Sequence, residues 1–305
     1  MNFSPISLEV TSVGKRIKFS VSLMVVLMIF ITTILSIKFA IYINRRESIH
    51  SLAKIEEEVK ETENQVQGEI EKQEEIMPST PIMPVLTEIG IENFNNIYNA
   101  DEKIAYLTFD DGPSKAVTPL ILDILKENEV PATFFVLGSR VEITPSLVKR
   151  AYEEGHYIAN HGYSHRYNDI YASKEAVLAE YNSTEIAIRN ALEIQEYNSH
   201  MFRFPGGSTG NTKYSEVKNE AKQFLFENGI MYLDWNCLTG DSEGKYTKEA
   251  LLEYLDHTSE AKGNVIVVLM HDGSDKILTA ETLQDAINLL RSKGFNFRNL
   301  YSVIE

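Results

Sequence analysis

The sequence has few of the residues that build disulfide frameworks or nucleic-acid-binding surfaces. Its 305 residues contain a single cysteine, Cys237, which excludes an intrachain disulfide framework and is expected to be a small buried residue. Its 29 Lys and Arg residues are outnumbered by 44 Asp and Glu, which gives a net charge of −15 at pH 7. Because nucleic acids reward clustered Lys and Arg, no nucleic-acid partner is expected.

Charge is absent from one long stretch near the N-terminus. The apolar run over 19–37 carries no charged residue and, as a helix, is long enough to cross a hydrocarbon core of roughly 30 Å. A cleaved signal peptide is the alternative, since a basic flank at 15–18 precedes the run, but no clear small-x-small cleavage site follows. We therefore predict a cytoplasmic N-terminus at 1–18 and a transmembrane anchor at 19–43. Basic residues are nearly balanced on its two sides, so they do not decide its orientation.

The segment that follows the apolar run is acidic and poor in apolar residues. Between Glu56 and Glu75 there are nine glutamates and two lysines. Apolar positions recur at spacings of three and four until Gly68, which is typical of an amphipathic helix or a weak coiled coil. Three prolines over 78–84 then indicate a stiff linker. We predict an acidic helical or disordered stalk with a Pro-rich linker over 44–86, and a weak homodimer through this stalk stays open.

From about residue 87 onward, short apolar runs alternate with helix-like stretches. The predicted strands are 104–109, 132–137, 157–160, 201–204, 231–235 and 265–270, with a final one at 301–304. The predicted helices are 117–128, 146–154, 174–193, 214–228, 248–261 and 281–293. Strands alternating with helices favour parallel βαβ units, and about seven units suit a closed or nearly closed barrel. The predicted fold is an α/β distorted (β/α) barrel over 87–305, with an open doubly wound sheet as the alternative.

Polar side chains stand at or just after the ends of five of these strands. They are Asp110 and Asp111, then His161 and His165, then Arg203, then Asp234, and finally His271. Each segment alone is more often structural: a turn, a core histidine or a capping acid. Together they fit one mouth of a barrel, where strand C-termini converge. One aspartate and two histidines can bind a divalent cation with positions left open, and an aspartate and a histidine then remain as base and acid.

This ordered set resembles the polysaccharide deacetylase family, the NodB-homology domains of carbohydrate esterase family 4, over about residues 100 to 305. The resemblance rests on Thr-Phe-Asp-Asp-Gly at 108–112, two histidines four residues apart, Arg-x-Pro at 203–205, Asp-Trp at 234–235 and Leu-x-His at 269–271. It implies that Asp110 is the general base and that Asp111, His161 and His165 are the metal ligands. It also implies that Arg203 orients the base, and that Asp234 orients His271, the general acid.

The same resemblance implies the residues that contact the substrate. Pro205, Gly206, Trp235 and Leu269 are expected to bind it, with the Gly206 amide as a donor to the oxyanion and Trp235 and Leu269 around the acetyl methyl. Two positions depart from the family pattern. Gly162 replaces a hydroxyl residue that would brace the histidine loop, and Gly206 stands where an aromatic residue often forms a wall of the groove.

The expected function is hydrolysis of N-acetyl groups on an amino-sugar polymer, most plausibly peptidoglycan N-acetylglucosamine, with Zn²⁺ as metal and Co²⁺, Mn²⁺ or Ni²⁺ as alternatives. Such polymer chemistry favours a single-pass membrane protein whose catalytic domain is extracellular. Chitooligosaccharides and exopolysaccharides remain alternative substrates. An O-acetyl xylan esterase and a catalytically silent glycan-binding module are the alternative functions.

Overall fold

The computed structural model describes residues 7–12, 15–20, 28, 32–33, 35–36, 38, 83–210, 213–260 and 262–304. The chain divides into two compact units, Met1–Pro78 and Ser79–Glu305. In the first unit, β1 (Ser7–Ser12) and β2 (Lys15–Ser20) form an antiparallel pair. Phe19 and Ser20 therefore belong to a strand, and the prediction that a helix begins at residue 19 is wrong.

The rest of the predicted anchor lies largely outside the described residues, and so does the stalk up to residue 82. Within the described ranges, no helix is both long and apolar enough to cross a bilayer. The second unit begins at Ser79, and its first helix is α2 (Glu88–Asn95). Thr87 is the N-cap of α2, and its side chain accepts a hydrogen bond from the Gly90 amide.

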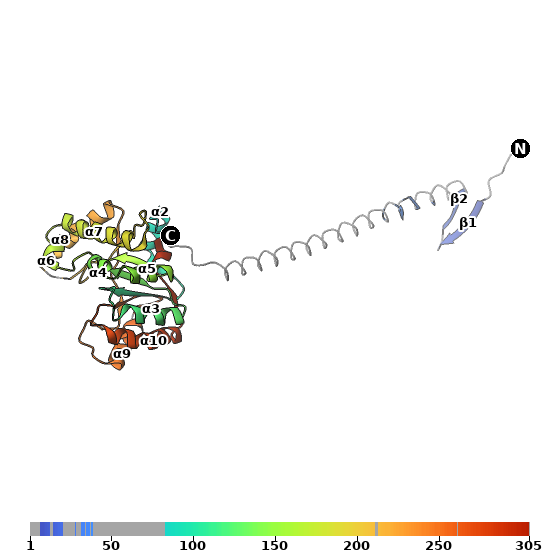
Figure 1. The fold of residues 1–305 in the computed structure, drawn as a ribbon. Coiled ribbons are helices and arrows are strands. Elements are labelled where there is room, and N and C mark those ends of the chain that lie inside the picture. The colour runs from blue at the N-terminus through green and yellow to red at the C-terminus, as the bar shows by residue number, and fades with distance from the viewer. Residues whose placement is uncertain are drawn as a thin grey trace. The chain divides into compact units, whose positions relative to one another are not determined.

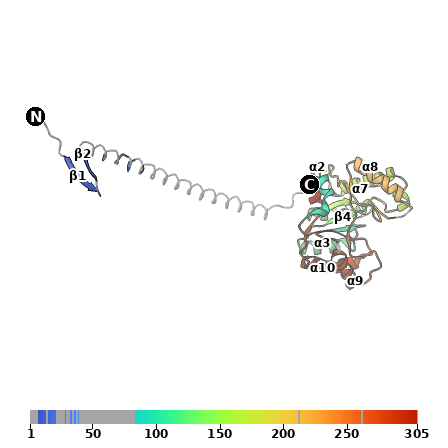
Figure 2. The ribbon, with the colours of Figure 1, turned by 180° about the vertical axis from the view of Figure 1, so that it is seen from behind.

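The second unit is built around one parallel sheet (Figures 1 and 2). Its strands run in the order β7-β6-β5-β4-β3-β9-β8, and β10 also pairs with β3. Their bounds are β3 Ile104–Asp110, β4 Thr133–Val136, β5 Tyr157–Asn160, β6 Met201–Phe202, β7 Met231–Tyr232, β8 Cys237–Leu238, β9 Val265–His271 and β10 Asn296–Arg298. The prediction of parallel βαβ units is confirmed.

The prediction of a closed or nearly closed, distorted (β/α) barrel is confirmed in part, because the barrel does not close. The path of paired strands has β7 at one end and β8 at the other, and no pairing joins these two among the described residues. On one edge of β3, β10 pairs with Ile104–Tyr106 and β4 pairs with Thr108–Asp110. The sheet is therefore a half-barrel.

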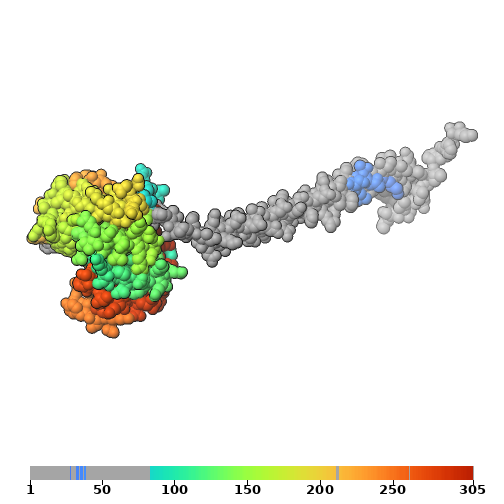
Figure 3. Space-filling view, viewed as in Figure 1, coloured from blue at the N-terminus to red at the C-terminus, as the bar shows by residue number. Residues whose placement is uncertain are grey.

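Helices flank the sheet on both sides. Their bounds are η1 Ile97–Asn99, α3 Thr118–Glu127, α4 Gly138–Ile143, α5 Pro145–Glu153, α6 Tyr167–Ile170, α7 Lys174–Leu192, α8 Ser215–Glu227, α9 Lys248–Glu260, α10 Ile277–Ser292 and α11 Tyr301–Ile304. Helices α7 and α8 lie near the β7 end of the sheet, and α9 and α10 lie near the β8 end (Figure 1). In the space-filling view they form opposite sides of the second unit (Figure 3).

The centre of the sheet is continuous apolar core. All seven residues of β3 are buried, as are six of the seven in β9. Strands covered on both faces read as unbroken apolar runs, which is why their positions could be predicted. Charged residues enter only where these two strands end, and the register sets Asp110 of β3 beside His271 of β9. Cys237 is fully buried, as expected.

The end of the chain departs from the predicted pattern. Residues Tyr301–Ile304, predicted as a strand, form helix α11, and the last strand is β10, whose first and last residues are exposed. A four-residue apolar run fits one turn of helix as well as a strand. Its buried members, Val303 and Ile304, pack into the core, while α2 lies against α11 closely enough for a Cβ on Gly90 to meet the Ile304 carbonyl at 2.3 Å.

Candidate active site

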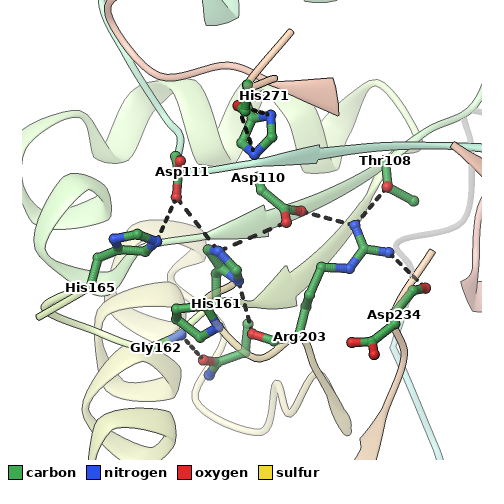
Figure 4. A network of polar contacts seen from close by, with 12 residues as sticks. Thr108, Asp110, Asp111, His161, Gly162, His165, Arg203, Asp234 and His271 are labelled. Carbon is green, nitrogen blue, oxygen red and sulfur yellow. Dashed lines mark hydrogen bonds and ion pairs between the residues drawn. The ribbon is translucent and has the colours of Figure 1, made fainter. Parts of the chain in front are cut away.

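The strand ends bring the predicted residues to one pocket of about 360 Å³. Asp110 and His271 are the last residues of β3 and β9, His161 directly follows β5, and Arg203 directly follows β6. Figure 4 shows them facing one another, with the Asp111 carboxylate directed at both predicted histidine ligands and with His161 facing Asp110 as well. Of the predicted catalytic residues, Arg203 and Asp234 do not line this pocket. The lining residues are Asp110, Asp111, His161, His165, Tyr167, Gly206, Trp235, Leu238, Gly240, Asp241, Ser242, Glu243, Leu269 and His271.

Asp111, His161 and His165 form a set that fits a divalent cation. One donor atom from each lies within 4.8 Å of the others, with Asp111 Oδ1 3.5 Å from His161 Nε2 and 3.3 Å from His165 Nε2. Asp111 Oδ1 is buried and has no hydrogen-bond partner among the described residues. Two imidazole nitrogens and a carboxylate oxygen around such an unpartnered atom are the donor set of an open metal site.

The ionisation of these ligands suits a cation. Burial lowers the pKa of His161, so its ring favours the neutral form that can donate a lone pair. Burial alone would raise the pKa of Asp111, but His161, His165 and His271 outweigh that effect and lower it. The His161 Nδ1 lies 2.8 Å from the Arg203 carbonyl oxygen, which accepts a hydrogen bond from it and so leaves Nε2 free to face Asp111.

The loop that carries the two histidines is braced without the hydroxyl that Gly162 lacks. The Glu180 carboxylate accepts from the amides of Tyr163 and Ser164 at 2.7 Å each and from the Ser164 hydroxyl at 2.7 Å. Asn160 Oδ1 accepts from the Gly162 amide at 2.9 Å. Gly162 has a φ of +84°, in the left-handed region that favours glycine. The brace therefore comes from α7 and β5 instead of from position 162.

Arg203 holds Asp110, as the sequence predicts. Its guanidinium is fully buried and donates from NH1 to Asp110 Oδ1 at 2.9 Å and to the Thr108 hydroxyl at 2.7 Å. The Leu233 carbonyl accepts from Nε at 3.0 Å, and the Phe135 ring lies 3.9 Å from the guanidinium carbon. A buried charge needs such partners, and Asp110 supplies the neutralising one. The other oxygen of Asp110 is left to face the ligand set, 3.8 Å from His161 Nε2.

His271 is oriented by Asp241, not by Asp234 as predicted. Asp241 Oδ1 lies 2.9 Å from His271 Nδ1, and Asp241 Oδ2 accepts from the His271 amide at 2.8 Å and from the Thr279 hydroxyl at 2.9 Å. Burial alone would lower the pKa of His271, but the hydrogen bond and charge of Asp241 raise it to about 9. His271 is therefore held protonated at neutral pH, as a general acid requires.

The role of Asp241 was not predicted from the sequence, because Asp241 lies in an irregular loop after β8, a two-residue strand that was not predicted either. Its only signal in the sequence is an acid directly after Gly240, close to a short apolar run at 237–238. Asp234 lies at the end of a predicted strand and next to the single tryptophan, so the sequence favoured Asp234 as the carboxylate that orients His271.

Asp234 instead holds the turn that follows Arg203. Its carboxylate accepts from the Ser208 amide at 2.8 Å and from the Ser208 hydroxyl at 2.7 Å. The buried Lys218 ammonium donates to the Gly207 carbonyl at 2.6 Å, and Tyr171 donates to the Pro205 carbonyl at 2.7 Å. The turn from Pro205 to Ser208 is thus fixed from three sides.

The four predicted substrate-binding residues divide into two groups. Gly206, Trp235 and Leu269 line the pocket. Pro205 is buried and does not line it. The Pro205 carbonyl accepts hydrogen bonds from the Tyr171 hydroxyl and, at 3.3 Å, from the Lys218 ammonium. Gly206 is exposed, and its amide has no hydrogen-bond partner in the part of the chain that the structure describes.

Comparisons with known proteins agree with this geometry. Residues 98–225 match the family model for polysaccharide deacetylase. The chain is 34% identical over 215 residues, 69% of this chain and 71% of the relative, to YheN of Bacillus subtilis (strain 168), which is described provisionally as a polysaccharide deacetylase. It is 34% identical over 195 residues to the peptidoglycan-N-acetylglucosamine deacetylase PgdA of Listeria monocytogenes, a match that covers 63% of this chain and 36% of PgdA. A solved CE4 esterase of Streptococcus mutans superposes with a TM-score of 0.63 at 28% identity, covering 73% of this chain and 99% of the esterase.

Proposed function

Because the chain belongs to the polysaccharide deacetylase family, we propose that it is a metal-dependent hydrolase that removes N-acetyl groups from an amino-sugar polymer, namely from N-acetylglucosamine of peptidoglycan. One observation carries the reaction type. A cation-binding set, a carboxylate paired with a buried arginine, and a histidine paired with a buried carboxylate all face one pocket. The proposed substrate is supported by the similarity to the Listeria enzyme, of which the chain spans 36%.

The cation would be held by Asp111, His161 and His165, and Zn²⁺ is the ion proposed for this donor set. When bound, it would acidify a water molecule and polarise the acetyl carbonyl. Asp110, fixed by Arg203, accepts the proton of the attacking water. The Gly206 amide, free of protein partners among the described residues, donates to the acetyl oxygen as it gains negative charge.

Departure of the amine needs a proton, and His271 supplies it. Water adds to the acetyl carbon, the carbon–nitrogen bond breaks, and acetate and the free amine form once nitrogen receives the proton. Asp241 stabilises the protonated imidazole before transfer and fixes the direction of its ring. Losing either the base or the acid is expected to cost on the order of 10²–10⁴ in rate.

The test is acetate release measured by mass spectrometry. Metal-stripped protein, with and without added Zn²⁺, is given peptidoglycan glycan strands, N-acetylglucosamine oligomers and acetylated xylan, with Asp110→Asn as control. Zn²⁺-dependent acetate from amino sugars, lost in Asp110→Asn, supports the proposal and ranks the substrates. Glycan binding without acetate release from any substrate would replace it with a silent binding module.

An O-acetyl esterase acting on xylan-type polymers is the second candidate, and the similarity to a solved CE4 esterase favours it. Ester cleavage depends less on His271, because an alkoxide is a better leaving group than an amine. Acetate released from acetylated xylan alone, in the same experiment, would assign the esterase.

We also propose that the chain is a single-pass membrane protein with its catalytic domain outside the cell. The support is the uncharged apolar run over 19–37 and the cell-envelope substrate. Fractionation of cells expressing the chain with and without residues 1–43 tests this, with protease accessibility of intact cells reporting the side. Recovery of the full chain in the soluble fraction would contradict it.

Sedimentation with and without residues 47–76 tests the homodimer through the stalk, and monomers in both cases would rule this dimer out.

A further inference from the structure

One pocket residue, Tyr167, lies outside every motif that pointed to the site. It opens α6, two residues after the ligand His165, and its side chain is 37% exposed. Its ring meets the His165 ring edge-on, with centroids 5.5 Å apart. It lines the pocket together with Gly206, which comes from the turn after β6.

The Tyr167 hydroxyl occupies the space that a side chain on Gly206 would need. A Cβ built on Gly206 would lie 2.5 Å from that hydroxyl oxygen and 3.2 Å from the ring carbon that bears it. Gly206 also has a φ of +73°, a conformation that L side chains rarely adopt. The aromatic wall that position 206 does not provide is thus provided by a residue from another segment.

Among the described residues, the hydroxyl has no hydrogen-bond partner that would explain its position. No hydrogen bond to the Tyr167 hydroxyl is formed within 83–210, 213–260 or 262–304. The hydroxyl lies against the Gly206 backbone, and its ring lies against the ligand His165. An acetyl oxygen that accepts from the Gly206 amide while the acetyl group is held at the ligand set would lie in the part of the pocket that Tyr167 and Gly206 line together.

We propose that Tyr167 is a catalytic residue whose hydroxyl donates a second hydrogen bond, beside the Gly206 amide, to the acetyl oxygen as it becomes an oxyanion. This role rests on the proposed function and adds a residue to it. A phenol hydroxyl suits this role because the ring is rigid, so the donor is already in position and needs no reorganisation when the oxyanion forms.

Two further tyrosines hold the Tyr167 ring in place. Tyr171 and Tyr214 pack edge-on against the ring, with centroids 5.7 and 6.0 Å away. These contacts fix the ring without using the hydroxyl.

The first test is the kinetics of Tyr167→Phe on N-acetylglucosamine oligomers. Loss of one oxyanion donor is expected to lower kcat by on the order of 10², with KM changed only a few-fold. Tyr163→Phe is the matched control, because the Tyr163 hydroxyl lies in the same loop region but donates to the exposed Glu142 at 2.8 Å. An unchanged kcat, or a rise in KM alone, would overturn the assignment.

A second variant approaches the same contact from the other side. In Gly206→Ala the new Cβ must displace the Tyr167 hydroxyl, so kcat should fall at least as far as in Tyr167→Phe. If the two changes remove one donor, adding Tyr167→Phe to Gly206→Ala should lower kcat little further. Fully additive losses would contradict the proposal.

The second readout needs no turnover and separates this proposal from the function. Acetate binding to the Zn²⁺-loaded protein is measured by calorimetry, and Tyr167→Phe is expected to bind acetate about tenfold or more weakly, the effect of a hydrogen bond to a charged group. Both proteins should bind one equivalent of Zn²⁺ equally. Unchanged acetate affinity, or loss of Zn²⁺ binding in the variant, would overturn the role of Tyr167 even if the parent released no acetate.

Discussion

The ligand side of the pocket, Asp111 with His161 and His165, is held differently from the proton-donor side, His271 with Asp241. Ligand-side residues stand on or beside strand ends, and their loop is closed by backbone amides that donate to Glu180. On the donor side, Asp241 lies in an irregular loop and is located by contacts to His271 and Thr279. The ligand side is therefore fixed largely by the fold, and the donor side by a few side chains.

The difference has a chemical consequence. Damage to the ligand side should remove the cation and every activity that depends on it. Damage to the donor side should leave the cation in place and slow only steps that need a proton from His271. Substitutions on the two sides should accordingly give different signatures in metal binding and in pH dependence.

The largest effect is expected on the ligand side, from His165→Ala. Removing one of three donors should abolish stoichiometric Zn²⁺ binding and lower kcat by more than about 10⁴, since cation and base act on the same water. Calorimetric titration with Zn²⁺ and acetate release measure the two effects. His257→Ala, at an exposed position of α9, is the control. Activity retained in His165→Ala would break the ligand assignment.

The next effect separates Asp241, on the donor side, from Asp234, which holds the turn after Arg203. Asp241→Asn should lower kcat for amide substrates by about 10², while Zn²⁺ binding stays intact, because His271 loses the partner that keeps it protonated. Asp234→Asn should cost about tenfold, through the turn that presents Gly206. The alkaline limb of the pH profile should move only in Asp241→Asn. The reverse pattern would restore Asp234 as the residue that orients the acid.

A smaller effect is the pH dependence itself. The pKa of His271 is raised to about 9, so the acid is present below that pH and is lost as pH rises through it. Above about pH 9, kcat for an N-acetyl substrate should fall about tenfold per pH unit. An O-acetyl substrate should show a weaker decline. Equal declines for amide and ester would contradict the assignment of His271 as the amine's proton donor.

The smallest effect concerns the brace of the ligand loop. Glu180→Gln weakens an acceptor of three hydrogen bonds and should lower Zn²⁺ affinity by about tenfold, as for other residues that orient ligands from outside. Glu142→Gln alters only the exposed partner of the Tyr163 hydroxyl and is the matched control. Equal Zn²⁺ affinity in both variants would show that the backbone alone fixes the loop.

Sequence patterns located the elements that are buried on both faces. The strand predicted at 157–160 is β5 as observed, and that at 104–109 lacks only Asp110 of β3. Strand β10 (Asn296–Arg298), whose first and last residues are exposed, was missed because its pattern is polar, and the two-residue β8 is too short to give one. Openness of the barrel was not predictable, since strand count and length do not say which neighbours pair.

The ligands and the base were predictable because each lies at a strand end within a compact motif. Asp241 and Tyr167 were not, because a loop and a one-turn helix give no periodic signal. Their roles depend on what they approach in space: His271 in one case and Gly206 in the other.

The most direct test of the account measures acetate release from N-acetylglucosamine oligomers while Zn²⁺ is titrated into the metal-stripped protein. Activity should rise linearly and stop at one equivalent in the parent. Asp110→Asn should bind the same equivalent of Zn²⁺ and remain inactive, because it keeps the ligand side and loses the base. Acetate release that does not depend on Zn²⁺, or that survives in Asp110→Asn, would contradict the account.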